Sequence, residues 1–155
     1  MIGIDPGTTK HGVVEIVDGR VVLADMFDTD SAIALVAHGM SEVACEWIES
    51  YGMPVGKELF QTVFHIGRMF EADPSMRLIP RRDIKLHLCG QPRAKDANIR
   101  QALLDKLGPV GTKKNPGPCY GVSGHLWSAL AVAVTAAEIH RTNGEWIPDA
   151  KTVEA

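Results

Sequence analysis

The chain has 155 residues, a formal net charge of −3 and 45% hydrophobic residues, which suits one globular domain with its own core. No stretch approaches the ~20 consecutive apolar residues of a membrane span, and no basic region followed by an apolar run opens the sequence, so we expect a soluble cytoplasmic protein. Three cysteines without a CxxC pair indicate neither a disulfide framework nor a zinc cluster, so reduced thiols are expected.

The first 28 residues predict three antiparallel strands. Apolar residues alternate in the first strand, so Ile2 and Ile4 share one face and Asp5 points from the other. The second strand spans residues 12–17 and the third spans residues 20–27. Asp-Gly between these two apolar runs is a strong hairpin signal, so a meander of three strands is expected.

Asp5 needs a physical reason to lie in an apolar strand. Burying a carboxylate without a partner costs several kcal/mol, so Asp5 binds a cation or accepts strong hydrogen bonds. Alternatively, Asp5 is a turn residue of Asp-Pro-Gly whose carboxylate is satisfied by local backbone amides. Glu46 poses the same question in a compact apolar strand predicted over residues 42–48.

The remaining elements alternate between helices and strands. Apolar spacing, caps and breakers predict helices over residues 29–38 (capped by Thr29, Asp30 or Ser31), 55–72, 81–88, 94–107 and 125–140, and a strand over residues 76–79. Residues 108–124 are rich in glycine and proline, which predicts a flexible loop. We therefore expect an α/β fold with a mixed sheet and helices against both faces, formed by residues 1–142, and a polar C-terminal tail of residues 143–155.

Basic residues gather in one block of the sequence. Between Arg81 and Lys114 there are nine Lys or Arg residues and three acids, although the whole chain is acidic. Such a block beside isolated acids suits a nucleic-acid enzyme, in which cations contact phosphates while acids hold metal. The alternative is a solvated charged surface.

Four segments together resemble the RuvC-type Holliday junction resolvases of the RNase H-like nuclease superfamily, particularly the short versions carried by bacteriophages. They are GIDPG at residues 3–7, VACE at 43–46, AKDANIRQ at 94–101 and HLWSALAVA at 125–133. They follow the family's order and lie near its spacing. The resemblance implies an RNase H-like sheet of three antiparallel strands followed by parallel strands.

The resemblance also implies a metal site. In that family four residues coordinate two divalent ions, and Asp5, Glu46 and His125 fill three of those positions. Ser128 falls on the fourth, where the family normally has aspartate, and a neutral serine is a poor magnesium ligand. Either water and substrate phosphate complete the coordination, or metal binding is weak and catalysis reduced.

The expected cofactor is Mg(II) or Mn(II), with two ions in each active site. Hydrolysis of a phosphodiester places negative charge on the attacking and leaving oxygens, and two cations about 4 Å apart stabilise both. Carboxylates suit either ion, and histidine admits Mn(II) more readily.

Further residues are candidates for binding DNA. The resemblance places Arg93 and Lys95 at phosphate-contacting positions and suggests an aromatic residue that stacks on an unpaired base. Tyr51 suits that role, whereas Trp47 is expected in the core. Additional phosphate contacts are expected, as a group, from Arg81, Arg82, Lys85, Arg100, Lys113 and Lys114.

The first hypothesis is a structure-selective endonuclease that cleaves Holliday junctions or other branched DNA as a homodimer in the cytoplasm, that of a bacterial host if a phage encodes it. The helix over residues 55–72 is the candidate dimer interface, unless its apolar stripe is only core. The alternatives are a junction-binding protein with weakened or lost catalysis, and an RNA-processing nuclease of the same superfamily. A nucleotide-phosphate loop at residues 5–9 ranks last, because sugar kinases and actin-like ATPases need far more chain.

Overall fold

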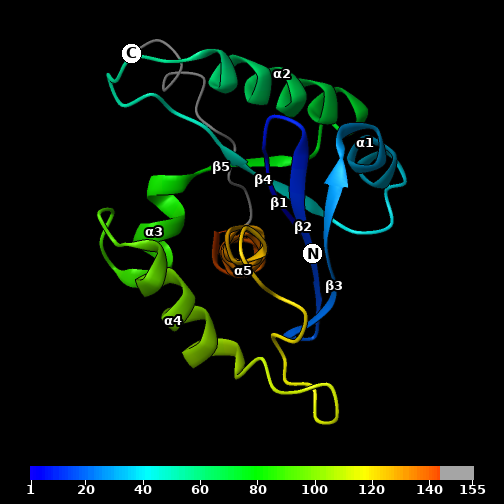
Figure 1. Ribbon diagram of the computed structural model, residues 1–155, viewed down its shortest axis with the longest axis vertical. Coiled ribbons are helices and arrows are strands. Elements are labelled where there is room, and N and C mark those ends of the chain that lie inside the picture. The colour runs from blue at the N-terminus through cyan, green and yellow to red at the C-terminus, as the bar shows by residue number, and fades with distance from the viewer. Residues whose placement is uncertain (144–155) are drawn as a thin grey trace.

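The computed structural model describes residues 1–143 and contains a mixed five-stranded sheet with helices on both faces (Figure 1). The sheet has the order β3-β2-β1-β4-β5. β1, β2 and β3 pair antiparallel, while β4 runs parallel to β1 and β5 runs parallel to β4, as predicted. The strands are β1 Ile2–Asp5, β2 Lys10–Val17, β3 Arg20–Asp28, β4 Val43–Trp47 and β5 Arg77–Pro80.

Two helices cover one face of the sheet and three cover the other (Figure 1). The first pair is α1 Thr29–Ala37 and α2 Lys57–Ala72, and the second group is α3 Arg81–Cys89, α4 Asp96–Leu107 and α5 Leu126–Asn143. Neighbouring strand residues pack into the hydrophobic cores on opposite faces of the sheet. Val13 belongs to the core under α1 and α2, and Val14 belongs to the core under α5. This alternation follows from the two-residue period of a strand.

The hairpin between β2 and β3 has the predicted turn. Asp18 and Gly19 have φ angles of 49° and 74°, and Val17 pairs with Arg20 across them. Positive φ at both central residues is the geometry of a type I′ turn, whose twist matches that of the flanking strands. The Asp-Gly signal therefore identified both the hairpin and its register.

Helix α5 lies directly on β1 because glycine leaves room for its backbone. A Cβ atom added at Gly3 would overlap the Ala129 carbonyl oxygen and the backbone and side chain of Ala133. Ala129 and Ala133 are themselves fully buried. Since alternate residues of a strand share a face, Asp5 points toward α5, as Gly3 does.

Three local expectations are corrected. The N-cap of α1 is Asp28, whose carboxylate accepts a hydrogen bond of 2.8 Å from the Ser31 N–H, so none of the three predicted caps serves. His11 follows the first turn, a position for which the sequence predicts a surface histidine, but it is fully buried. Helix α2 begins at Lys57, two residues after the predicted start.

The segment 108–124 has no regular helix or strand but is tied to the sheet. Gly111 and Pro116 form an isolated bridge, and the Val21 N–H donates to the Pro118 carbonyl at 2.9 Å. The expected C-terminal tail, apart from Asn143 at the end of α5, lies outside the described residues. Within residues 1–143, no helix combines the length and the apolar character needed to cross a membrane.

Candidate active site

Asp5 and Glu46 come from adjacent parallel strands. Ile4 of β1 pairs with Cys45 of β4, and each acid is the next residue of its strand. Burial raises the pKa of Asp5 to about 7, and the charge of Glu46 adds to the rise. The fold therefore places two carboxylates of distant sequence position in one electrostatic environment.

His125 reaches Asp5 from the residue before α5. Its Nδ1 lies 3.7 Å from Oδ2 of Asp5, and its side chain is 82% exposed, whereas that of Asp5 is 18% exposed. Both residues line a cleft of about 390 Å³ that the turn after β1 also borders. The predicted meeting of a strand acid with the start of the last helix is thus present.

Gly12 forms part of the same site and was missed by sequence reasoning. It is the β2 partner of Asp5, and a Cβ atom there would lie 3.5 Å from the Asp5 Cβ and 3.3 Å from the His125 carbonyl oxygen. Its missing side chain leaves the space in which Asp5 and His125 approach each other. The signal was a glycine inside an otherwise apolar strand, which indicates a close approach.

Ser128 stands one helical turn after His125, but it does not line the cleft. It is half-buried, and its backbone N–H donates to the His125 carbonyl at 3.0 Å. Asp5 and His125 are therefore the predicted metal-site residues that share this cleft.

Glu46 is paired with an arginine. Its Oε2 accepts a 2.8 Å bond from Nη1 of Arg81, and Nη2 of the same guanidinium donates to Oδ1 of Asp96 at 2.6 Å. Burial raises the pKa of Glu46, and Arg81 counteracts part of that rise. Glu46 is 8% exposed, so the pair supplies the charge compensation that a buried carboxylate needs.

Asp5 has much weaker compensation and suits a cation. Among the described residues, the one ion pair of Asp5 is the 3.7 Å contact with His125. This contact is an ion pair only when the His125 ring is protonated. A carboxylate and an imidazole are suitable donors for Mn(II), and the carboxylate suits Mg(II). Within the described part of the chain, however, no three His, Cys, Asp or Glu side chains form a ready metal cluster.

A second cleft, of about 540 Å³, lies beside Glu46 and is basic. Arg81 belongs to it, and Tyr51, 62% exposed with a φ of 47°, stands at its border. Five of the nine predicted DNA-binding residues line this cleft, which is formed by Tyr51, Arg81, Arg82, Lys85, Pro92 and Arg93. Although they are spread over more than 40 residues of sequence, the fold gathers them.

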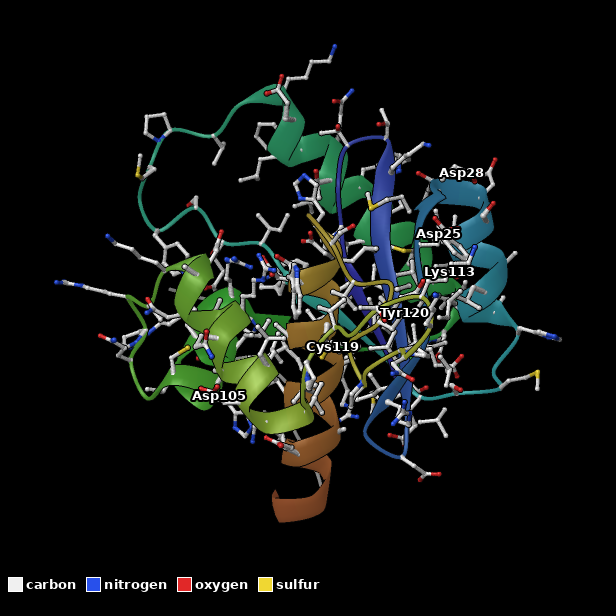
Figure 2. The ribbon with its side chains drawn as sticks, turned by 60° about the horizontal axis from the view of Figure 1, so that its bottom comes forward. Asp25, Asp28, Asp105, Lys113, Cys119 and Tyr120 are labelled. Atoms are coloured by element: carbon white, nitrogen blue, oxygen red, sulfur yellow. The ribbon has the colours of Figure 1, made fainter. Side chains whose placement is uncertain are left out.

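The other four predicted DNA contacts lie elsewhere. Lys95 precedes α4, and the Arg100 guanidinium lies 5.0 Å from the centre of the Trp127 ring, where it joins α4 to α5. Lys113 and Lys114 are exposed in the loop that packs against β3, and Figure 2 labels Lys113. Because β3 and β5 are opposite edges of the sheet, these two lysines and the basic cleft belong to different sides of the molecule.

A partly buried chain of polar groups supports the turn after Asp5. The Gly7 N–H donates to Nδ1 of His11 at 3.1 Å, and Nε2 of His11 lies 3.0 Å from the Thr29 hydroxyl. That hydroxyl lies 3.5 Å from Nδ1 of His65, whose Nε2 is 3.1 Å from the Thr8 carbonyl. Helices α1 and α2 thereby hold the turn that borders the cleft.

Aromatic side chains lie exposed on α2. Phe60 and Phe64 are 63% and 66% exposed, while Ile66 and Met69 on another side of the helix are buried in the core. The helix thus has a core face and a separate apolar face. Trp47 is half-buried and packs on the core under α1 and α2, which confirms its expected structural role.

Comparison with known proteins establishes the fold. No protein-family model matches the sequence, and no curated protein is significantly similar to it in sequence. The RuvC structure of Thermus thermophilus matches with a TM-score of 0.66 at 20% identity, over 90% of this chain and 94% of that chain. T. thermophilus RuvC in complex with a Holliday junction substrate matches with a TM-score of 0.59 at 21% identity, over 90% and 93% of the two chains.

The chain has the RuvC fold. The likeness confirms the predicted RNase H-like class of mixed sheet and helices. These two structures are of T. thermophilus RuvC, so the assignment to the bacteriophage versions stays a prediction.

Proposed function

We propose that this chain is a metal-dependent, structure-selective endonuclease that cleaves Holliday junctions or other branched DNA. The observation that carries the proposal is the position of Asp5 and Glu46 at adjacent strand ends in a RuvC fold, with His125 3.7 Å from Asp5. The basic cleft beside Glu46 supports a DNA substrate, because phosphate contacts dominate the affinity of nucleic-acid binding. The cytoplasmic location remains a prediction.

Asp5 and His125 would hold Mg(II) or Mn(II), with Glu46 beside them. When bound, the ion would polarise the scissile phosphate and lower the pKa of the attacking water. The guanidinium and ammonium groups of the basic cleft would bind the flanking phosphates, and Tyr51 would stack on a base opened at the junction. The turn held by His11 and His65 would keep Asp5 in place.

A homodimer would supply the two sites that symmetric nicking of a four-way junction requires. The exposed face of α2 supports this arrangement, because Phe60 and Phe64 together offer apolar surface that a partner would cover. Phe64→Glu should convert the dimer to a monomer in sedimentation experiments, whereas Phe27→Leu, in β3, should leave assembly unchanged. A wild-type chain that sediments as a monomer would contradict the dimer.

The function is tested by nicking of a synthetic four-way junction with Mg(II) or Mn(II). We expect cleavage of the junction and little cleavage of a linear duplex of the same sequence. Asp5→Asn and Glu46→Gln should each lower the rate by at least about 100-fold, the scale of a lost catalytic group. Asp105→Asn, an exposed site on α4, is the matched control and should cleave as the wild type does (Figure 2).

Two outcomes would redirect the proposal. Cleavage of RNA substrates in preference to the junction would favour the RNA-processing alternative. Absence of cleavage with either ion across a range of pH would contradict an endonuclease.

The second candidate function is a junction-binding protein with weakened catalysis. It is favoured by Ser128 at a position where the resemblance implies an acid, and by the pairing of Glu46 with Arg81. Tight junction binding with slow or no cleavage in the wild type, and faster cleavage by Ser128→Asp, would support this reading over the first.

A further inference from the structure

Arg81 occupies the centre of the charge arrangement around Glu46. It begins α3 directly after β5, and β5 is fixed against β4 because Glu46 pairs with Ile79 and Trp47 with Pro80. The backbone therefore holds Arg81 beside the carboxyl end of β4. Its planar guanidinium reaches Glu46 at 2.8 Å and Asp96 at 2.6 Å, the short distances of charge-assisted hydrogen bonds.

The pair is partly shielded from water. The side chains of Arg81 and Glu46 are 27% and 10% exposed, whereas that of Asp96 is 81% exposed. A cation that displaced Arg81 from Glu46 would leave a half-buried guanidinium with only the exposed Asp96, which is unfavourable. Arg81 is therefore a resident positive charge of the site rather than a freely solvated phosphate contact.

The formal charges of the site balance with one divalent ion. Asp5 lies in the electrostatic field of Glu46, Arg81 and Asp96, so the four groups form one system. Three carboxylates and one guanidinium carry a formal charge of −2, and the Lys85 ammonium also acts on Glu46, so one Mg(II) or Mn(II) offsets the negative charge whereas a second ion would leave the site positive. Ser128 adds no negative charge that could compensate for a second ion.

The geometry also separates the two positive positions. The cleft that contains Asp5 and His125 is not lined by Glu46, and the cleft that contains Arg81 is not lined by Asp5. We propose that the Arg81 guanidinium takes the place of one of the two divalent ions, so that the centre binds a single ion at Asp5 and His125. This inference rests on the proposed function and concerns the same site.

Arg81 has a defined part in the reaction under this arrangement. A guanidinium has five N–H donors in a fixed fork, and two of its nitrogens already hold Glu46 and Asp96. Arg81 also lines the cleft to which Tyr51 and Lys85 belong. A phosphate oxygen bound there would receive an N–H bond and a positive charge from Arg81, which a second ion would otherwise supply.

Counting bound Mn(II) tests the inference without DNA and without activity. The free Mn(II) signal in electron paramagnetic resonance gives the number of ions that the full chain binds, and spin coupling between ions reveals a pair about 4 Å apart. We expect one ion per wild-type chain and no coupling. Asp5→Asn should lose that ion.

Arg81→Met should free Glu46 and allow a second ion, so the count should rise to two and coupling should appear. Arg82→Met is the matched control, because Arg82 lines the same cleft but has no ion pair with Glu46, and its count should stay at one. If Arg81→Met does not fold, Arg81→Gln, which also lacks the positive charge, replaces it with the same expected count of two. A wild-type chain that binds two coupled ions, or none, would overturn the inference, whereas the loss of junction cleavage alone would bear on the proposed function.

Discussion

The rings of His11 and His65 meet edge to face with their centres 5.7 Å apart, and the Thr29 hydroxyl lies within hydrogen-bond reach of both. Because the Gly7 N–H donates to Nδ1 of His11, Nε2 of that ring must carry the proton and donate to Thr29. The Thr29 hydroxyl lies 3.5 Å from Nδ1 of His65, and Nε2 of His65 donates to the Thr8 carbonyl, which can only accept. The hydrogen-bonded chain thus runs through both rings and the Thr29 hydroxyl, and it begins and ends on one turn.

Removal of the Thr29 hydroxyl should destabilise the protein. Thr29→Val keeps the shape of the side chain but leaves a buried ring N–H without its acceptor, which costs about 1–3 kcal/mol. Thr9→Val, at an exposed threonine nearby, should change the free energy of unfolding by less than about 0.5 kcal/mol. Urea unfolding of both variants measures the difference. Equal stabilities would show that the chain of hydrogen bonds contributes nothing.

The raised pKa of Asp5 predicts a pH dependence of stability. Burial and the charge of Glu46 raise this pKa from 3.8 in the unfolded chain to about 7 in the folded one. The folded state therefore binds more protons between these values, so the contribution of Asp5 to stability falls as the pH rises through this window and is constant above it. Asp5→Asn removes the effect and should stabilise the metal-free protein more at about pH 8 than at about pH 5.

Mn(II) provides the internal control for this prediction. At about pH 8 the ion should raise the midpoint of unfolding of the wild type, because it binds the folded state. Asp5→Asn should gain little from Mn(II) at any pH. If the variant and the wild type show the same dependence on pH, Asp5 does not titrate as described.

Patterns of local sequence predicted much of this fold. The alternation around Asp5, the Asp-Gly turn and the apolar spacing of α2 each depend on residues close in the chain, so their elements were identified to within a few residues. The approach of Asp5 and His125 followed from a resemblance, because no local pattern specifies which distant segments meet. The RuvC fold brings them within 3.7 Å.

The missed features depend on tertiary geometry. Arg81 and Glu46 are 35 positions apart, and their contact requires the parallel register of β4 and β5. The spacing of apolar residues along the sequence does not specify that register. His11 stands between a lysine and a glycine, neighbours that suggest exposure, yet its partners on α1 and α2 bury it. The N-cap of α1 lies in a run of four polar residues from Asp28 to Ser31, each of which can cap a helix. Only the backbone geometry determines that Asp28 is the N-cap.

The close packing of α5 on β1 predicts a large cost for Gly3→Ala. The added methyl group would collide with backbone atoms of Ala129 and Ala133, which cannot move without shifting the helix. We expect a loss of at least about 1–3 kcal/mol, the usual cost of overpacking. Gly67→Ala is the matched control on α2, where a Cβ meets nothing within 4 Å. It should stabilise the protein by about 0.5–1 kcal/mol, since alanine favours a helix. A lower midpoint of thermal unfolding for Gly3→Ala and a higher one for Gly67→Ala would support the close contact between β1 and α5.

Removal of the Thr135 hydroxyl should stabilise the protein, because this hydroxyl is buried without a hydrogen-bond partner among the described residues. Thr135→Val replaces that hydroxyl with a methyl group of similar size and removes the cost of burying an unpaired polar group, which is about 1–3 kcal/mol. We therefore expect a more stable protein. Thr62→Val is its matched control on α2, where the buried hydroxyl donates to the Glu58 carbonyl at 2.9 Å, and its loss should lower stability. Urea unfolding midpoints of the two variants should move in opposite directions. A decrease for Thr135→Val would indicate that its hydroxyl has a partner, such as a buried water.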